Sequence, residues 1–345
     1  MSPPLTVRLR QRAVRAATSL PPAVLRALAG PAEVVDGQEL DVQLQAGLKV
    51  QRRFGPRLDT MTPAEARRAA IAAFEPYQPS FAPMARVFDE LAPGPAGPIP
   101  VRVYVPSDHD GGLLVWLHGG GGVIGSIASA DPFCRDLARG ARCAVASVEY
   151  RLAPEHPHPA AIDDALAAWP WLVAHARRWG ADPARVAVGG DSFGGYLAAW
   201  VERGGRAARP PLPAPRALLL FYPLLDLTLT ARSCELFADG YGLTRALTHW
   251  FRGHYLPDLA ACRDASPGLV ADVAGAPPTL IVAAGFDPIR DDGRAYAERL
   301  AAAGGTIRYQ AHPSLIHGFI DLVGACAAAR RAVDDAAAWL NRALA

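Results

Sequence analysis

The sequence predicts an α/β fold in which a mostly parallel central sheet is flanked by helices and carries a helical cap. Short, β-rich apolar runs recur along the chain beyond residue 98. Helical stretches lie between most of these runs. Continuous apolar strands that alternate with helices are typical of a parallel sheet covered on both faces.

The first 90 residues are predicted to be largely helical. Apolar residues recur at three- and four-residue spacing over Leu40–Val50 and Pro63–Phe74. Thr62 is followed by a proline and, three residues later, by Glu65, which is a favourable helix start. Residues 92–98 read APGPAGP and predict a turn or linker, because this density of proline and glycine cannot hold a helix.

Strands and helices are then expected in alternation. The predicted strands are Leu113–Leu117, Ala144–Val148, Val186–Val188, Leu218–Phe221, Thr279–Ala283 and Thr306–Gln310. The predicted helices are Pro132–Gly140, Ala160–Trp179, Gly194–Arg203 and Gly293–Ala303. The segment from Phe221 to Asp264 is too long for a crossover and contains a predicted helix, Thr244–Tyr255, so we interpret it as an insertion above the sheet.

Composition excludes several classes of protein. The 345 residues are 51% hydrophobic and 20% charged, which is enough apolar material for a large core. The net charge of +2 argues against a nucleic-acid-binding protein. The five cysteines form no C-x-x-C pair, so we expect reduced, buried thiols and neither a metal nor another cofactor. No apolar run approaches the roughly 18 residues of a membrane span, so stable membrane insertion is not expected.

The N-terminal segment allows more than one interpretation. It has no acidic residue before Glu33 but carries five arginines, Arg8, Arg10, Arg12, Arg15 and Arg26. Such a segment could be an organelle-targeting or membrane-surface helix, and we favour a surface helix of the cap. It lacks the compact apolar stretch of a secretory signal, so we expect a cytoplasmic protein. The sequence is compatible with a homodimer.

A glycine-flanked serine is the sharpest local feature. Residues 189–195 read GGDSFGG, and Ser192 stands between Gly190 and Gly194, directly after a predicted strand and at the start of a predicted helix. This is the context of a nucleophile elbow, in which a tight, strained turn exposes the serine hydroxyl above the sheet. An incidental Gly-Ser turn is the alternative interpretation. The pattern predicts a nucleophilic serine.

A second glycine run follows the strand Leu113–Leu117. Residues 118–122 read HGGGG, and bare backbone N–H groups at a strand end can bind a developing oxyanion. A phosphate-binding loop is disfavoured, since no Gly-Lys-Ser/Thr follows. We interpret His118 as an anchor of the loop.

A nucleophilic serine needs a base, and the base needs an orienting group. Asp287 directly follows one predicted strand and His317 follows another, so both lie where α/β active sites collect. Either residue alone could be structural. The order Ser192, Asp287, His317 is the order expected of an α/β-hydrolase triad, and we predict these three as nucleophile, orienting acid and general base.

With these motifs the chain resembles the hormone-sensitive-lipase family of α/β-hydrolases, which are esterases with an HGGG motif and a GDSxGG elbow. The matching stretches read YRLAPE (150–155), FYPLLDL (221–227), FADGY (237–241), GFDPIRD (285–291) and IHGF (316–319). They cover about residues 85–320. The resemblance implies an N-terminal helical cap over residues 1–85, an α/β-hydrolase domain over 86–345, and a second cap segment at about 227–264.

The resemblance also implies the remaining site residues. The oxyanion donors are expected to be the N–H groups of Gly120, Gly121 and Phe193. Two departures concern the pocket: Gly122 replaces the usual aromatic after HGGG, and Phe193 replaces the usual alanine after the nucleophile. We expect the Phe193 ring to occupy the space that Gly122 leaves open. The pocket residues are predicted to be Gly122, Phe193, Leu225 and Ile316. Asp191, Glu155 and Asp291 are interpreted as structural.

The expected activity is hydrolysis of short- to medium-chain carboxylic esters through an acyl-enzyme, with a small-molecule ester as the partner. Lactone hydrolysis and deacetylation are close variants. A non-catalytic receptor is the alternative from another class. Family members that act as gibberellin receptors lack the catalytic histidine, and the presence of His317 argues against this alternative.

Overall fold

The central sheet has eight strands. The computed structural model describes residues 5–79, 81–208, 210–270 and 272–345. Its strands are β3 (Arg86–Ala92), β4 (Ile99–Val105), β5 (Leu113–Leu117), β6 (Ala144–Val148), β7 (Val186–Asp191), β8 (Leu218–Phe221), β9 (Thr279–Phe286) and β10 (Ile307–Ile316). They lie in the order β10-β9-β8-β7-β5-β6-β4-β3, and every neighbouring pair from β10 to β6 is parallel. The predicted mostly parallel α/β sheet is therefore confirmed.

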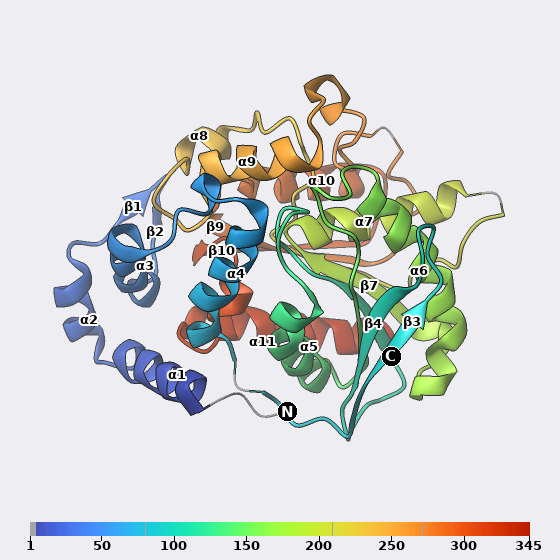
Figure 1. Cartoon of the computed structure of the whole chain (residues 1–345), viewed down its shortest axis with the longest axis horizontal. Helices are drawn as coiled ribbons and strands as arrows, with labels where there is room; N and C mark the ends of the chain where they lie inside the picture. The colour runs from blue at the N-terminus through green and yellow to red at the C-terminus, as the bar shows by residue number, and fades with distance from the viewer. Residues whose placement is uncertain (1–4, 80, 209, 271) are drawn as a thin grey trace.

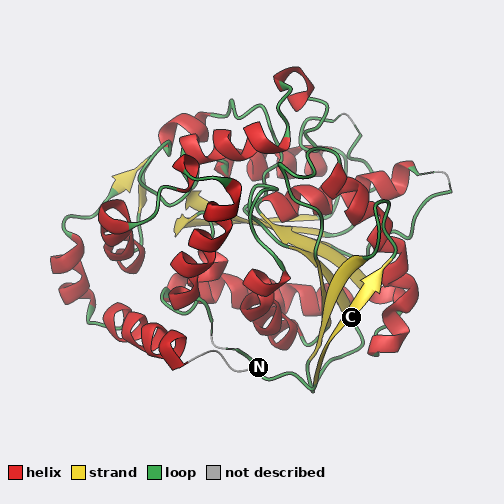
Figure 2. Cartoon of the chain, in the orientation of Figure 1, coloured by secondary structure: helices red, strands yellow, loops and turns green. Residues whose placement is uncertain are grey.

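Helices cover both faces of this sheet (Figures 1 and 2). Along β5, Leu113, Val115 and Leu117 belong to one buried cluster, whereas Leu114 and Trp116 belong to the other, because alternate side chains point to opposite faces. The first cluster includes residues of α6 (Ala160–His175), α7 (Phe193–Ala207) and α10 (Arg290–Ala302). The second includes residues of α5 (Ile127–Ala141) and α11 (Ala327–Leu344). Burial on both faces explains why the strands are continuous apolar runs.

Residues 5–79 are mainly helical, as predicted, but the prediction of helix up to residue 90 was wrong for residues 86–90, which belong to β3. Residues 5–79 form α1 (Leu5–Thr18), α2 (Pro22–Ala29), α3 (Val42–Phe54) and α4 (Pro63–Phe74), with 3-10 turns η1 (Leu58–Thr60) and η2 (Glu75–Tyr77). The start of α4 is confirmed in detail, since Thr62 and Glu65 form a reciprocal capping box. A small hairpin of β1 (Val34–Val35) and β2 (Gln38–Glu39) was not predicted. In Figure 1 the blue α1, α2 and α3 lie together at the left.

Several boundaries differ from the prediction. Helix α5 begins five residues before Pro132, because Ser126 and Ser129 form a capping box there. The predicted turn is confirmed over residues 93–98, which join the antiparallel strands β3 and β4, but these two strands were not predicted. Between β8 and β9 lie α8 (Arg232–Leu236), α9 (Arg245–Tyr255) and η5 (Leu259–Cys262). Helix α9 confirms the helix expected over Thr244–Tyr255, and Thr244 caps it.

Two expectations from composition can be compared with the structure. All five cysteines are free and buried, as predicted. Within the described ranges, no helix combines the length and apolar character needed to cross a bilayer. Residues 1–4 of the acid-free N-terminal segment lie outside the described residues.

Candidate active site

The ends of three parallel strands bring the predicted triad together. Ile316 at the end of β10 pairs with Phe286 at the end of β9, after an irregularity between His312 and Ile316 shifts the register. The next residues along these two strands are Asp287 and His317, which therefore leave the sheet side by side. Strand β7 ends at Asp191, and the following residue is Ser192. The carboxyl ends of parallel strands meet at one edge of a sheet, which is where α/β sites form.

The turn that presents Ser192 requires glycine on both sides. Ser192 has φ 52° and ψ −116°, a strained conformation for a residue with a side chain. A Cβ atom on Gly190 or Gly194 would clash with the carbonyl oxygen of Leu117 on β5. The Ser192 N–H donates to the Phe221 carbonyl at 2.9 Å, which ties the turn to β8. The Ser192 hydroxyl is thereby held at the edge of the sheet.

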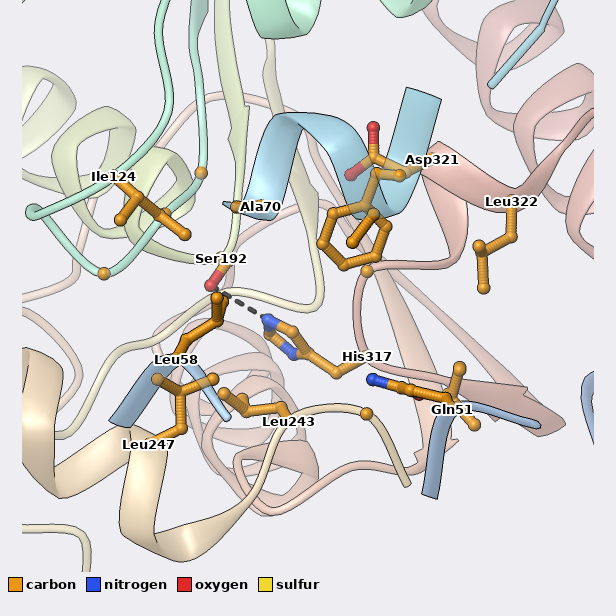
Figure 3. Close-up of a pocket in the computed structure, with 18 of the residues that line it drawn as sticks. Gln51, Leu58, Ala70, Ile124, Ser192, Leu243, Leu247, His317, Asp321 and Leu322 are labelled. Atoms are coloured by element: carbon orange, nitrogen blue, oxygen red, sulfur yellow. Dashed lines mark hydrogen bonds between the residues drawn. The ribbon is translucent and has the colours of Figure 1, made fainter. Parts of the chain in front are cut away.

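His317 connects the other two side chains. Its Nε2 lies 3.0 Å from Oγ of Ser192, and its Nδ1 lies 2.8 Å from Oδ2 of Asp287 (Figure 3 draws the first contact). Asp287 is fully buried, and its Oδ1 accepts a bond from the Ile289 N–H at 2.9 Å. An ionised carboxylate can only accept, so Nδ1 carries the proton and Nε2 is left to accept the serine proton.

The glycine run after β5 lines the same cavity as Ser192. Gly120 and Gly121 have φ values of 120° and 61°, which glycine adopts without steric cost. Among the described groups, none accepts a hydrogen bond from the N–H of Gly120, Gly121 or Phe193. His118 is buried, stacks on Tyr150 and lies 2.8 Å through Nδ1 from the Gly119 carbonyl, so it anchors the loop.

Two carboxyl groups lie deep in the same site. The Gly119 N–H donates to Asp191 at 2.9 Å, which connects the glycine run to the elbow. Burial, with Asp321 nearby, raises the pKa of Asp191 to about 8. Burial also raises the pKa of Asp321 to about 6, against the opposing effects of a 3.3 Å hydrogen bond from Gln78 and of the nearby His317. Asp191 thus links the glycine run to the elbow, and its structural role stays a prediction.

A cavity of about 1700 Å³ opens over Ser192 between the N-terminal helices, α9 and the sheet edge. Figure 3 shows Leu58, Leu243 and Leu247 grouped on one side of Ser192, with Asp321 on the other side. These leucines, with Ile124, give the cavity an apolar wall beside the serine, which suits an apolar ligand.

The predicted pocket residues are only partly brought to this cavity. Phe193 and Ile316 line it. Gly122 and Leu225 are not among the described residues that line it, so this part of the prediction was wrong. Leu225 is fully buried, and its backbone N–H donates to Asp292 at 3.0 Å. The side of Gly122 on which a Cβ would stand is occupied by Phe193.

Three residues near the site were not anticipated. The ring of Tyr222 packs on His317 with centroids 4.7 Å apart, and Asp321 faces the cavity. Arg67 binds the carbonyl of Val123, directly after the glycine run. Tyr222 lies in the quoted FYPLLDL motif, which could have signalled it. Arg67 had no such signal, since its partner Val123 is 56 positions away. Among the described residues, no group of three or more His, Cys, Asp or Glu side chains could hold a metal ion.

Comparison with known families decides the membership of the chain. Residues 114–321 match a protein family defined by the alpha/beta hydrolase fold. The chain belongs to this family. Within it, the chain falls among the hormone-sensitive-lipase-like members, as its motifs predicted.

Characterised α/β-hydrolases resemble it along most of its length. The carboxylic ester hydrolase LipN of Mycobacterium tuberculosis is 43% identical over 304 residues, which cover 85% of this chain and 80% of LipN. The ethyl acetate hydrolase of Pseudomonas putida is 40% identical over 228 residues, 64% of this chain and 71% of that enzyme. The crystal structure of the thermophilic carboxylesterase EstE1, from a metagenomic library, superposes with a TM-score of 0.76 at 37% identity, covering 83% of this chain and 98% of EstE1.

Proposed function

We propose that this α/β-hydrolase is a serine carboxylesterase that hydrolyses short- to medium-chain carboxylic esters. The observation that carries the proposal is the pair of hydrogen bonds through His317, 3.0 Å to Ser192 and 2.8 Å to Asp287. A serine, a base and a buried acid in this arrangement form the machinery of acyl transfer. The relatives named as esterases support the same class of reaction.

The proposed reaction has two steps. The Ser192 oxygen attacks the ester carbonyl carbon while its proton moves to Nε2 of His317. The tetrahedral intermediate collapses, the bond to the alcohol oxygen breaks, and His317 returns the proton to the leaving alcohol. Water then attacks the acyl-enzyme with the same help from His317, which releases the carboxylic acid and restores the serine. Asp287 stabilises the imidazolium in both steps.

The negative oxygen of each tetrahedral intermediate would be bound by the N–H groups of Gly120, Gly121 and Phe193. These three groups have no described acceptor within the protein, so they can donate to the substrate. Removal of one such donor typically costs about 3–4 kcal/mol of transition-state stabilisation. The leucines beside Ser192 would hold the apolar part of the ester.

The test is the release of p-nitrophenol from its acetate, butyrate and octanoate esters by the wild-type protein and by Ser192→Ala. A panel of lactones and acetylated alcohols is assayed in parallel by proton release. We expect turnover of at least one short or medium ester and its loss in Ser192→Ala. Equal rates for the two proteins would reject the esterase proposal. Tight ligand binding without turnover would instead favour a receptor.

A further inference from the structure

Arg67 connects the N-terminal helices to two loops beside the nucleophile. It lies on α4, and its Nε donates to the Val123 carbonyl at 2.8 Å, while its Nη2 donates to the Ala153 carbonyl at 2.9 Å. The same guanidinium binds the two carboxylate oxygens of Glu155 at 2.9 and 2.6 Å. A planar, five-donor fork suits such multiple contacts, whereas a lysine ammonium does not.

Val123 belongs to the loop that contains the expected oxyanion donors. This loop has positive φ at Gly120, Gly121, Gly122 and Gly125. Glycine populates many backbone conformations equally well, so such a run does not define its own shape. Within the loop, the Val123 and Ile124 N–H groups donate to the Gly120 carbonyl at 3.0 and 2.9 Å, and Nδ1 of His118 lies 2.8 Å from the Gly119 carbonyl. The conformation of the loop therefore depends on contacts from outside the run.

The second loop that Arg67 binds supports the adjoining peptide of the glycine loop. The Ala153 N–H donates to the Gly122 carbonyl at 2.8 Å, and the Ala153 carbonyl accepts from Arg67. Two consecutive carbonyls of the glycine loop, at 122 and 123, are thus held by one connected set of bonds. The guanidinium spans this set and joins it to α4.

We propose that Arg67 is a positioning residue for the oxyanion hole, acting through the Val123 and Ala153 carbonyls. The inference rests on the proposed esterase function. Oxyanion donors act only when they lie about 2.7–3.1 Å from the developing charge, so a small shift of the loop weakens them. Such a shift affects the transition state more than the bound ester, because the ground-state carbonyl carries little charge.

Glu155 orients Arg67 and does not itself touch the glycine loop. The Arg67 guanidinium lowers the pKa of Glu155 to about 2, so the carboxylate is ionised at neutral pH. The pair is partly exposed, which makes its own contribution to stability small. Glu155→Gln retains an acceptor for Arg67 and leaves both carbonyl bonds in place, so it separates loss of the ion pair from loss of loop support.

The experiment compares Arg67→Met, Arg67→Lys and Glu155→Gln with the wild type. Arg68→Met is the matched control, since Arg68 is the exposed neighbour on the same helix. Each variant is measured for kcat and KM on the best ester, for thermal unfolding, and for inhibition by a trifluoromethyl ketone and by the product alcohol. The ketone forms a hemiketal oxyanion with the serine, whereas the alcohol needs no oxyanion donor.

For Arg67→Met we expect kcat to fall about 10-fold or more with KM changed less than about threefold, since the lost interaction acts in the transition state. The affinity for the ketone should fall together with kcat, while the affinity for the product alcohol should not change. The kcat of Arg67→Lys should lie between those of Arg67→Met and the wild type. Glu155→Gln and Arg68→Met should have a kcat close to that of the wild type.

The outcomes distinguish the two proposals. A wild type that hydrolyses no ester rejects the proposed function. An active wild type with unchanged kcat in Arg67→Met overturns the role of Arg67. The role is also overturned if kcat falls while ketone affinity is retained, because the oxyanion donors would then still be in place. It is overturned as well if alcohol affinity falls as much as ketone affinity, because a general loss of structure would then be the cause. If Arg67→Met does not fold, Arg67→Lys with a wild-type unfolding temperature and wild-type kcat overturns it equally.

Discussion

The ring of Phe193 occupies the space beside Gly122. A Cβ atom on Gly122 would lie 2.8 Å from Cζ of Phe193 and 3.1 Å from Cδ2 of Tyr255. Phe193 is fully buried, and its ring meets that of Tyr255 edge-on with centroids 4.7 Å apart. This is the position expected from the two departures in the motifs. Gly122 also has φ 73°, so a side chain there is strained as well as crowded.

The first prediction concerns this pair. Phe193→Ala should lower the free energy of unfolding by about 3–5 kcal/mol, because it empties a buried, aromatic-lined site. Gly122→Ala should destabilise the wild-type protein more than it destabilises the Phe193→Ala variant. The backbone strain at residue 122 arises in both backgrounds, whereas the clash with the Phe193 ring arises only in the wild type. We expect a coupling of about 1 kcal/mol in a double-mutant cycle measured by urea unfolding. Additive effects would show that the ring and residue 122 do not interact.

The second prediction concerns Asp287. Asp287→Asn should lower kcat about 10³–10⁴-fold while KM changes little, because an amide can also donate and no longer holds the proton on Nδ1 of His317. Asp291→Asn is the control, since Asp291 binds the Ser233 N–H and two arginines and does not contact His317. Steady-state kinetics on the best ester test both. Comparable losses in the two variants would argue that the acid at 287 acts only through folding.

The third prediction concerns the pH dependence of stability. Burial raises the pKa of Asp321 from its ordinary value near 3.8 to about 6. As the pH rises from about 4 to 6, the unfolded chain releases this proton first, so the folded state loses relative stability. The side chain of Asp321→Asn does not titrate. The free energy of unfolding of this variant, relative to that of the wild type, should therefore rise by about 1–3 kcal/mol between pH 4 and pH 7. Urea unfolding at a series of pH values measures the difference; a constant difference contradicts the prediction.

Glu155 should behave in the opposite sense. The Arg67 guanidinium lowers its pKa from 4.5 to about 2, so the carboxylate stabilises the folded state above pH 4.5 and loses this effect as the pH falls toward 2. Glu155→Gln should therefore be less stable than the wild type at pH 7, and this deficit should shrink on acidification. The same unfolding series measures it. A deficit that grows at low pH would mean that Arg67 does not stabilise the ionised form.

The fourth prediction concerns the glycines of the elbow. Gly194→Ala should abolish activity and strongly destabilise the protein, because its Cβ would overlap the Leu117 carbonyl of β5. Gly253→Ala is the matched control on α9, where a Cβ meets no atom within 4 Å. That change should raise the unfolding free energy by about 0.5–1 kcal/mol, since glycine disfavours a helix interior. A fully active, stable Gly194→Ala would refute the close approach of β5.

Local patterns in the sequence predicted the elements that carry the site. The capping box of Thr62 and Glu65, the glycines beside Ser192 and the buried parallel strands were all predicted, because caps, tight turns and apolar runs depend on residues near one another in the chain. Strands β3 and β4 were missed; the burial of β3 alternates between exposed and half-buried residues, and neither strand is one of the continuous apolar runs used for the prediction. The sequence predicts the start of α5 at Pro132, whereas the helix begins at Ile127 and contains this proline in its second turn.

The sequence by itself determined the family, the strand–turn–helix setting of Ser192 and the order of the three triad candidates, since each is recognised from short motifs and from their order along the chain. Only the tertiary structure decided how these parts meet. The register of β9 and β10 brings Asp287 and His317 together, Phe193 takes the space beside Gly122, and Arg67 reaches loops 56 and 86 residues away. These relationships depend on packing between distant segments, and no local pattern encodes such packing.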